Sequence, residues 1–413
     1  MGPFESSPCL AVACSGGPDS MALLGLTHDW TKRCGGKVVA LIVDHRLRPE
    51  SSKEATEVAR AIRDIGVQVQ ILRRKGGAIN VGVQERAREV RYRLLQEYCL
   101  KFGILHLLVA HHREDQAETV RMREAKASGV DGLAGMSHLL EYKDVRILRP
   151  LIEFSKGSLR ATAAAWNLPV LDDPSNDDER FERVRVRRDI SAQMLVKELV
   201  EVAKYHAFIR RDREMAVAAS LARACTLYPE GYAWLDPTIF WTVSSEIAHA
   251  CLAAICAMIG GKAHPPRRVR TARLLEAIAK DRIAGGRTLA GCRIVPKGRR
   301  LLFYREAQNV KPAMSISDGC HWDGRFRIEV TNDSCDLEVA KLGENGLRIL
   351  QDAGIAVQAF GIPYGVLMTL PAIRGVEGVR HVPHLCYSRA GEAFNGRIRF
   401  APIRPLQATR FTG

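Results

Sequence analysis

The residues best suited to chemistry near the start of the chain form the run Ser15-Gly16-Gly17-Pro18-Asp19-Ser20. Its glycines allow backbone N–H groups to converge on a phosphate without obstruction by side chains. Pro18 suits the first turn of a helix, whose N-terminus adds the positive end of its dipole, and Ser20 offers a hydroxyl to a phosphate oxygen. No lysine follows the glycines as in a Walker A loop, and the GxGxxG spacing is missing. The run therefore predicts a phosphate-binding loop of another class, with an ordinary strand-to-helix turn as the alternative.

A second group of chemically useful residues lies in the string AHHREDQAET at residues 110–119. His111 is expected at the end of a strand, with Asp115 and Glu118 about one helical turn apart on the helix that follows. Two carboxylates on one face could hold a cationic amine and receive its proton. A metal site is one alternative, because histidine and carboxylates are also metal ligands. An acidic first turn that complements the helix dipole is the other.

Arginines supply a third group. Arg88 and Arg91 are three residues apart and share a helix face, as a pair that clamps a phosphate or a nucleotide would. A solvated basic face with salt bridges is the alternative for this pair. Farther along, Arg183, Arg185 and Arg187 follow the string DPSN at residues 173–176. Of these, Arg183 and Arg187 are candidates for contacts with a phosphate.

Alternating strands and helices must position these side chains. The apolar runs predict strands at Cys9–Cys14, Lys37–Asp44, Val67–Leu72 and His106–His112. Helical spacing follows the glycine-rich loop and recurs at Ser51–Ile65 and Gln84–Phe102. Repeated strand–helix units imply right-handed crossovers and an α/β fold with a doubly wound, Rossmann-like parallel sheet. Ligands of such sheets bind beyond the carboxyl ends of the strands, so the segment at 43–49, which closes the second strand, should lie beside the glycine-rich loop.

The 413-residue chain is long enough for two or three domains. We expect an α/β domain at residues 1–195 and a mainly helical domain at 196–312. The latter carries basic stretches at Pro265–Arg273 and Lys297–Arg300. Short strands and turns after about residue 315 predict a small α+β accessory domain at 313–413. His381 and His384 in this last part are expected to be ordinary surface histidines.

The composition limits which binding partners and which cellular compartment we expect. The 61 basic and 46 acidic residues give a net charge of +15, which favours polyanionic partners such as nucleic acid. The eleven cysteines form no CxxC pair, which favours reduced thiols over a metal site or a redox motif. No apolar run reaches the roughly 18 residues of a membrane span, and the N-terminus lacks the features of a signal peptide. We therefore expect a cytoplasmic protein without a bound structural metal or a membrane partner; a homodimer is compatible with these patterns.

The loop at residues 15–20 resembles the SGGxDS loop of the N-type ATP pyrophosphatases, the PP-loop superfamily. Members of that superfamily hold the pyrophosphate of ATP in this loop while a substrate oxygen attacks the α-phosphorus. The resemblance implies that Ser15, Gly16, Gly17, Pro18, Asp19 and Ser20 bind ATP and that an adenylated intermediate forms. It does not identify the acceptor.

Further strings resemble the tRNA(Ile)-lysidine synthetases in particular, and they occur in that family's order. These strings are VDHRLRP at residues 43–49, ERAREVRY at 85–92, AHHREDQAET at 110–119, GVDGLAGM at 129–136 and DPSN with its following arginines at 173–187. The resemblance implies that Val43 and Asp44 contact the adenosine. It implies catalytic roles for Arg91, His111, Asp115 and Glu118, and tRNA contacts for Arg88, Arg183 and Arg187. It also implies that residues 1–195 are the catalytic domain and that residues 196–312 are a linker or tRNA-binding domain. Arg46, Glu114 and Val184 depart from the family pattern, in which Gly, Asp and Asn are usual.

The implied reaction is the ATP-dependent, Mg²⁺-assisted joining of L-lysine to C2 of the wobble cytidine in the CAU anticodon of tRNA(Ile). It proceeds through a cytidine adenylate and yields lysidine, AMP and pyrophosphate, so that the tRNA reads AUA. One alternative is another adenylating tRNA-modifying enzyme of the PP-loop superfamily. The other is a non-catalytic protein that binds tRNA or nucleotides through a degenerate site.

Overall fold

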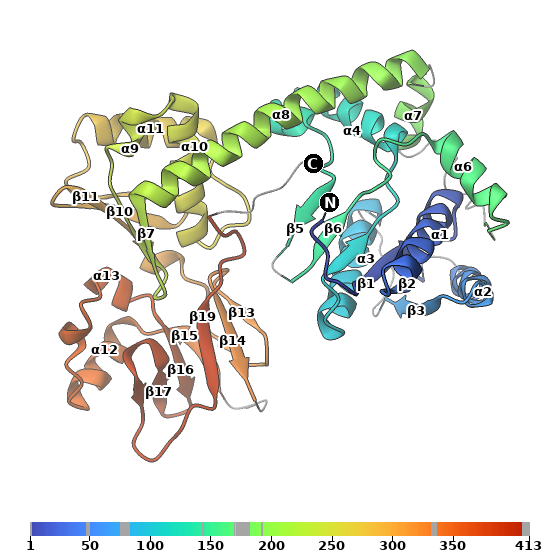
Figure 1. The fold of residues 1–413 in the computed structure, drawn as a ribbon. Helices are drawn as coiled ribbons and strands as arrows, with labels where there is room; N and C mark the ends of the chain where they lie inside the picture. Colours follow the sequence, from blue (N-terminus) through green and yellow to red (C-terminus); the bar gives the residue numbers. More distant parts are fainter. Residues whose placement is uncertain are drawn as a thin grey trace. The chain divides into compact units, whose positions relative to one another are not determined.

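The computed structural model describes residues 2–46, 50–74, 83–142, 144–168, 170, 182–190, 193–331 and 337–406. Contacts divide the chain into two compact units, the first running up to Asp212 and the second beginning at Arg213. The division falls within the long helix α8, Gln193–Ala224 (Figure 1). The domain boundaries near residues 195 and 312 stay predictions. None of the described helices is both long and apolar enough to cross a membrane.

The first unit is built on a six-stranded sheet with the order β3-β2-β1-β4-β6-β5. All neighbouring strands are parallel except β5, which runs antiparallel to β6. The strands are β1 Cys9–Cys14, β2 Lys37–Asp44, β3 Gln68–Arg73, β4 His106–Leu108, β5 Leu139–Glu141 and β6 Arg146–Leu148. The predicted doubly wound parallel sheet is therefore confirmed.

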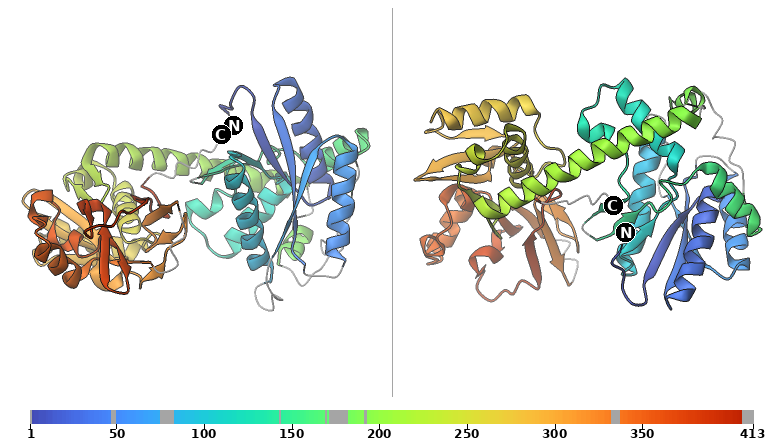
Figure 2. Two further views of the ribbon diagram at one scale, coloured as in Figure 1. Left: turned by 90° about the horizontal axis from the view of Figure 1, so that it is seen from below. Right: turned by 45° about the horizontal axis from the view of Figure 1, so that its top comes forward.

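Helices cover both faces of this sheet (Figure 2), because its strands are apolar on both sides. Leu10, Val12 and Cys14 of β1 pack in one core with α1, α2 and α6, whereas Ala11 and Ala13 pack in another core with α3. The helices of the unit are α1 Pro18–Arg33, α2 Ser51–Asp64, α3 Val83–Lys101, α4 Arg113–Ala125, α5 Val130–Leu133, α6 Lys156–Ala165 and α7 Glu182–Asp189.

Strand β4 is shorter than the sequence pattern predicts. It ends at Leu108, although the backbone N–H of Val109 still donates to the carbonyl of Leu148 at 2.9 Å. The predicted strand end at His112 is instead the N-cap of α4, because His112 and Asp115 form a reciprocal capping box. Residues 109–112 therefore connect the strand to the helix at the carboxyl end of β4.

The order of strands creates a switch point at β1. From β1 the chain proceeds outward through β2 and β3 on one side, whereas β4 and β6 lie on the other. Connections that leave a parallel sheet in opposite directions open a crevice at the carboxyl ends of the two central strands. That crevice lies where β1 runs into the loop at residues 15–17 and where β4 runs into His111 and His112.

The second unit begins with a five-stranded antiparallel sheet of order β7-β8-β11-β10-β9. Its strands are β7 Cys225–Tyr228, β8 Tyr232–Leu235, β9 Arg287–Leu289, β10 Cys292–Lys297 and β11 Arg300–Arg305, and its helices are α9 Ile239–Thr242, α10 Ser245–Ile259 and α11 Arg268–Ala279. The sequence pattern indicates helices in this region and treats residues 228–232 as an interruption. They form the turn of the β7–β8 hairpin, in which Gly231 has a φ of 81°.

Two further antiparallel sheets complete the second unit, with the orders β12-β15-β16-β17-β18 and β13-β14-β19. Their strands are β12 Met314–Ser315, β13 His321–Trp322, β14 Phe326–Val330, β15 Glu338–Lys341, β16 Pro371–Gly375, β17 Gly378–Val382, β18 Tyr387–Ser388 and β19 Gly396–Phe400. The helical elements are α12 Gly343–Asp352, α13 Tyr364–Leu367 and the 3₁₀ turns η2 Ala307–Asn309, η3 Val357–Phe360 and η4 Pro383–Leu385. These short strands agree with the pattern of the last hundred residues.

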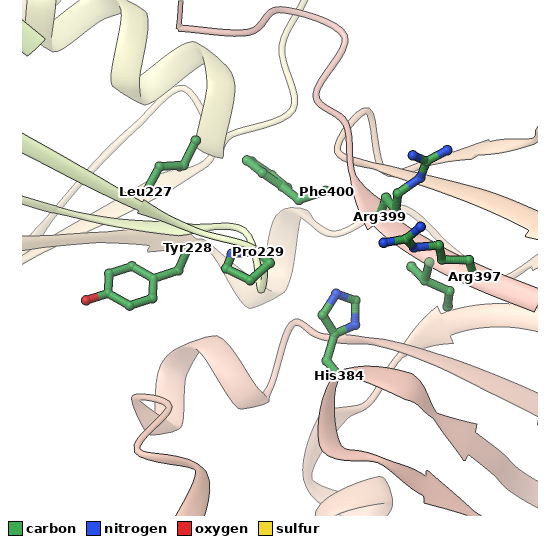
Figure 3. A pocket seen from close by; sticks show the side chains of 8 residues that line it. Leu227, Tyr228, Pro229, His384, Arg397, Arg399 and Phe400 are labelled. Atoms are coloured by element: carbon green, nitrogen blue, oxygen red, sulfur yellow. The ribbon is translucent and has the colours of Figure 1, made fainter. Parts of the chain in front are cut away.

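The two histidines that were expected at the surface have different environments. His381 is buried, and its Nδ1 lies 3.0 Å from the hydroxyl of Ser388, so the expectation was wrong for this residue. His384 points into a hollow of about 440 Å³ beside Pro229, Arg397 and Phe400 (Figure 3). None of the site residues predicted from sequence lines this hollow.

Candidate active site

The predicted phosphate loop joins β1 to α1. Gly16 has a φ of 89°, in the region that favours glycine, and a Cβ on Gly17 would meet only the hydroxyl of Ser15, 3.7 Å away. The Ser20 hydroxyl donates to the Gly17 carbonyl at 3.0 Å and accepts from the N–H of Ser15 at 3.2 Å. The buried Ser20 therefore holds the loop from within, and the loop ends at Pro18, the first residue of a 16-residue helix. This arrangement suits an anion at the helix N-terminus.

Asp19 points from this loop toward α4. Its Oδ2 lies 3.7 Å from His112 Nε2, and its Oδ1 is buried without a hydrogen-bond partner among the described residues. Burial raises the pKa of Asp19, against the attraction of His112 and Lys156. Burial alone would lower the pKa of His112, but Glu114, Asp115 and Asp19 raise it above its usual value. The loop thus has beside it a histidine that gains a proton readily and a carboxylate oxygen that can accept a ligand.

The carboxylate of Asp44 organises the turn at the end of β2. Its oxygens accept from the N–H of Arg46 at 3.0 Å and from the hydroxyls of Ser51 at 3.2 Å and Ser52 at 2.6 Å. Burial would raise the pKa of Asp44, but these hydrogen bonds hold it below its usual value. Arg46 adopts a φ of 52°, which explains why glycine suits this position in the resembling family. Residues 47–49 of the string lie outside the described residues.

His111 is held as a neutral ring between β4 and α4. The Nε of Arg149 donates to its Nδ1 at 3.2 Å, and Arg149 is itself fixed by a hydrogen bond to the Ser137 carbonyl at 2.7 Å. Burial lowers the pKa of His111 well below its usual value, and the charge of Arg149 adds to this effect. Because Nδ1 accepts a hydrogen bond, the ring proton resides on Nε2, which makes His111 a hydrogen-bond donor at that atom.

Asp115 and Glu118 on α4 are both bonded to arginines of α7. Arg183 donates from Nη2 to Asp115 Oδ1 at 2.7 Å and from Nε to Glu118 Oε2 at 2.5 Å. Arg187 donates from Nε to Glu118 Oε1 at 2.7 Å. The side chain of Glu118 is fully buried, whereas those of Arg183 and Arg187 are 33% and 37% exposed. The two predicted groups of carboxylates and arginines therefore form one network.

The arginines of α3 lie toward the same strand ends. Arg91 is close enough to His45 to add to the effect of burial, which lowers the pKa of that histidine. Arg88 is exposed, and its guanidinium carbon lies 5.2 Å from the centre of the Tyr92 ring. Both arginines are thus placed as the shared helix face predicts, with Arg91 nearer to the sheet.

Two side chains of α4 fasten neighbouring segments to the site. Gln116 exchanges hydrogen bonds with the backbone of Met136, at 2.9 and 2.7 Å, which docks the GVDGLAGM segment. Glu114, which stands where Asp is usual, accepts from the N–H of Lys156 at 2.9 Å and thereby links α4 to the start of α6. The DPSN string and Arg180 lie outside the described residues.

The geometry brings together Asp19, His111, Asp115, Glu118, Arg183 and Arg187 at one edge of the sheet. Sequence reasoning missed His112 and Arg149 as members of this site. The signal for His112 is its position three residues before Asp115, the spacing of a capping box. No local pattern indicates that Arg149 bonds to His111, because His111 lies 38 residues earlier in the chain.

Comparison with known proteins agrees with this geometry. A family model described as a PP-loop domain matches residues 2–194. A tRNA(Ile)-lysidine synthase of Ruegeria pomeroyi is 35% identical over 370 residues, which cover 88% of this chain and 85% of that protein. Proteins of the same name from Orientia tsutsugamushi and Wolbachia pipientis are 29% and 32% identical, covering 94% and 81% of this chain and 91% and 80% of their own lengths. The chain therefore belongs to the tRNA(Ile)-lysidine synthase family.

Proposed function

We propose that the chain joins L-lysine to C2 of the wobble cytidine in the CAU anticodon of tRNA(Ile), in the cytoplasm and with consumption of ATP. The observation that supports this proposal is that the glycine-rich loop at 15–20 and the carboxylates of Asp115 and Glu118 lie at one sheet edge, in a chain of this family. Lysidine, AMP and pyrophosphate are the products. A homodimer is compatible with the scheme, which places every reacting group in one chain.

ATP is assigned to the loop Ser15–Ser20, with the adenosine at Val43 and Asp44 of the neighbouring strand end. The positive end of the α1 dipole and the raised pKa of His112 favour a polyphosphate here. Mg²⁺ fits beside Asp19, because its buried Oδ1 has no partner among the described residues. The ion would neutralise phosphate charge, and it typically keeps waters and phosphate oxygens as its remaining ligands.

The first chemical step is attack of the cytidine C2 carbonyl oxygen on the α-phosphorus, which expels pyrophosphate. The target base must leave the anticodon stack to reach the phosphate. His111 donates from Nε2 to the charge that develops at the phosphate, and Arg91 compensates that charge from the α3 side. The step leaves AMP bonded to the base and makes C2 electrophilic.

Lysine completes the reaction by displacing AMP from C2. Asp115 and Glu118 hold its ε-ammonium group and accept the proton that must leave before attack. The lysine amine must replace Arg183 to reach these oxygens, because Arg183 now bonds to both carboxylates. Arg88, Arg183, Arg187 and the basic stretch at 267–273 contact the tRNA backbone, which predicts an affinity that falls with salt.

The proposal is tested by incubating the protein with tRNA(Ile) bearing CAU, ATP, Mg²⁺ and radiolabelled lysine, with methionine tRNA as the control. Label in the isoleucine tRNA alone is expected. Pyrophosphate release that depends on tRNA but brings no lysine incorporation would favour another adenylating enzyme. Neither signal would favour a non-catalytic binder.

A further inference from the structure

The carboxylates assigned to the lysine amine already hold cations in this structure. Both oxygens of Glu118 are occupied, by Arg183 Nε at 2.5 Å and Arg187 Nε at 2.7 Å. Asp115 accepts from Arg183 at Oδ1 and from the backbone N–H of His112 at Oδ2, which is 3.0 Å away. Every oxygen of the two carboxylates thus already accepts a hydrogen bond, so an ammonium ion competes with the arginines for them.

On the basis of the proposed function, we propose that RNA regulates this site by drawing Arg183 and Arg187 away from the carboxylates. Phosphates of the bound RNA form hydrogen bonds with the two guanidinium groups. The lysine ammonium group then binds to the carboxylate oxygens that the arginines have left. RNA and lysine then bind cooperatively, and the amine is held in the site chiefly when its acceptor is present.

The difference in exposure between the carboxylates and the arginines determines that the arginines are the groups that can change partners. Glu118 is fully buried and fixed in α4, so it cannot leave the site to follow an arginine. The side chains of Arg183 and Arg187 are 33% and 37% exposed, so solvent and ligands reach them. A guanidinium that has lost a carboxylate regains paired hydrogen bonds from a phosphate, because both present two oxygens in matching geometry.

The charge balance of the network also predicts that RNA strengthens lysine binding. Two carboxylates and two arginines form a neutral group, so a lysine ammonium added to the intact network leaves one uncompensated positive charge at a buried position. Transfer of even one arginine to an RNA phosphate removes that excess. The coupling is consequently positive, and reciprocity requires lysine to tighten RNA binding by the same factor.

The test is calorimetric titration of lysine into the full-length protein, with and without an unmodified tRNA(Ile) transcript bearing CAU and without ATP. We expect the transcript to tighten lysine binding by about tenfold, a typical size for coupling between sites. The reverse titration of transcript, with and without saturating lysine, should show the same factor. Equal lysine affinity in both states would overturn the proposal, and this arm needs no variant.

Arg183→Gln removes the competitor that bridges Asp115 and Glu118. The variant should bind lysine about tenfold more tightly without RNA and lose most of its response to the transcript, because only Arg187 still occupies Glu118. The matched control is Arg121→Gln on the same helix as the carboxylates, which removes an exposed arginine paired with Glu124 at 3.4 Å. Equal tightening of lysine binding in both variants would indicate a general effect of charge and contradict the competition.

Failure of this inference can be distinguished from failure of the proposed function. Lysine incorporation into tRNA together with uncoupled lysine binding refutes only this inference. Absence of both incorporation and lysine binding refutes the proposed function as well.

Discussion

Two networks of arginine and carboxylate in this chain have similar contacts but differ in exposure. In the first unit, Arg183 and Arg187 bond to Asp115 and Glu118 and remain about one-third exposed. In the second unit, Asp323 accepts from Arg305 at 2.9 Å and from Arg325 at 2.7 Å, and all three side chains are at most 2% exposed.

The difference teaches where an ion pair can serve as a binding site. Burial lowers the pKa of Arg325 to about 10, against the attraction of Asp323 that keeps it charged. If one member of this buried group is lost, the remaining charge has no water or ligand to compensate it. We therefore expect this group to stabilise the fold and not to bind a ligand. The network of α4 and α7 has one face in solvent, so a phosphate or an amine can replace a partner there.

The largest effect is expected from Asp323→Asn in the enclosed network. Asparagine tolerates the φ of 55° at this position but removes the charge that compensates both arginines. The free energy of unfolding of the second unit should fall by about 3–5 kcal/mol. Denaturant titration measures this change, and lysine transfer per folded molecule should be retained. A loss of activity at full stability would contradict the structural role.

Asp19→Asn should show the opposite pattern at the site. Asp19 is the carboxylate assigned to Mg²⁺, and its loss should slow tRNA-dependent pyrophosphate release by about 100-fold or more, since a group that neutralises transition-state charge is typically worth that much. Because burial raises the pKa of Asp19, its charge costs stability, and the variant should unfold at an equal or higher denaturant concentration. Unchanged pyrophosphate release would remove Asp19 from the active site.

A smaller effect is expected from pH through His112. Its pKa is raised by Glu114, Asp115 and Asp19, so its proton is fully present below the usual histidine value of about 6.5 and is lost as pH rises through the higher folded value. ATP binding should therefore weaken several-fold across that upper range, since the loop loses a positive neighbour. In His112→Gln, ATP affinity measured by titration should stay flat over this range. An equally steep profile in the variant would exclude His112 as the cause.

The smallest effect is expected from Arg46→Gly at the end of β2. Glycine relieves the left-handed backbone but loses chain entropy on folding, so the two terms should nearly cancel, with a change in unfolding free energy of about 1 kcal/mol or less. ATP affinity should be retained, because the hydrogen bond from the backbone N–H at 46 to Asp44 does not depend on the side chain. A large loss of ATP affinity would show instead that the Arg46 side chain contacts the nucleotide.

The parts that could be predicted from sequence are those with local signals. Cys9–Cys14 and Lys37–Asp44 are continuous apolar runs, so their strands agree residue for residue with the pattern, and the glycine-rich turn marks the loop between strand and helix. The β7–β8 hairpin was missed because its strands have four residues each, too few to show alternation.

Pairings across long stretches of chain left no local signal. Glu118 and Arg183 are separated by 65 residues, and Arg305 and Asp323 by 18, so neither network could be predicted from spacing. Asp115 and Glu118 were expected to face a ligand directly, and their occupation by arginines emerges only from the packing of α7 on α4.

The central claim is that this one sheet edge forms a bond between lysine and the wobble cytidine. The most direct measurement is mass spectrometry of nucleosides from CAU-bearing tRNA(Ile) after incubation with the protein, ATP, Mg²⁺ and lysine. The account predicts a new nucleoside heavier than cytidine by one lysine less one water, with loss of the wobble cytidine alone. Recovery of unmodified cytidine from a reaction that consumes ATP, or lysine attached elsewhere in the tRNA, would contradict it.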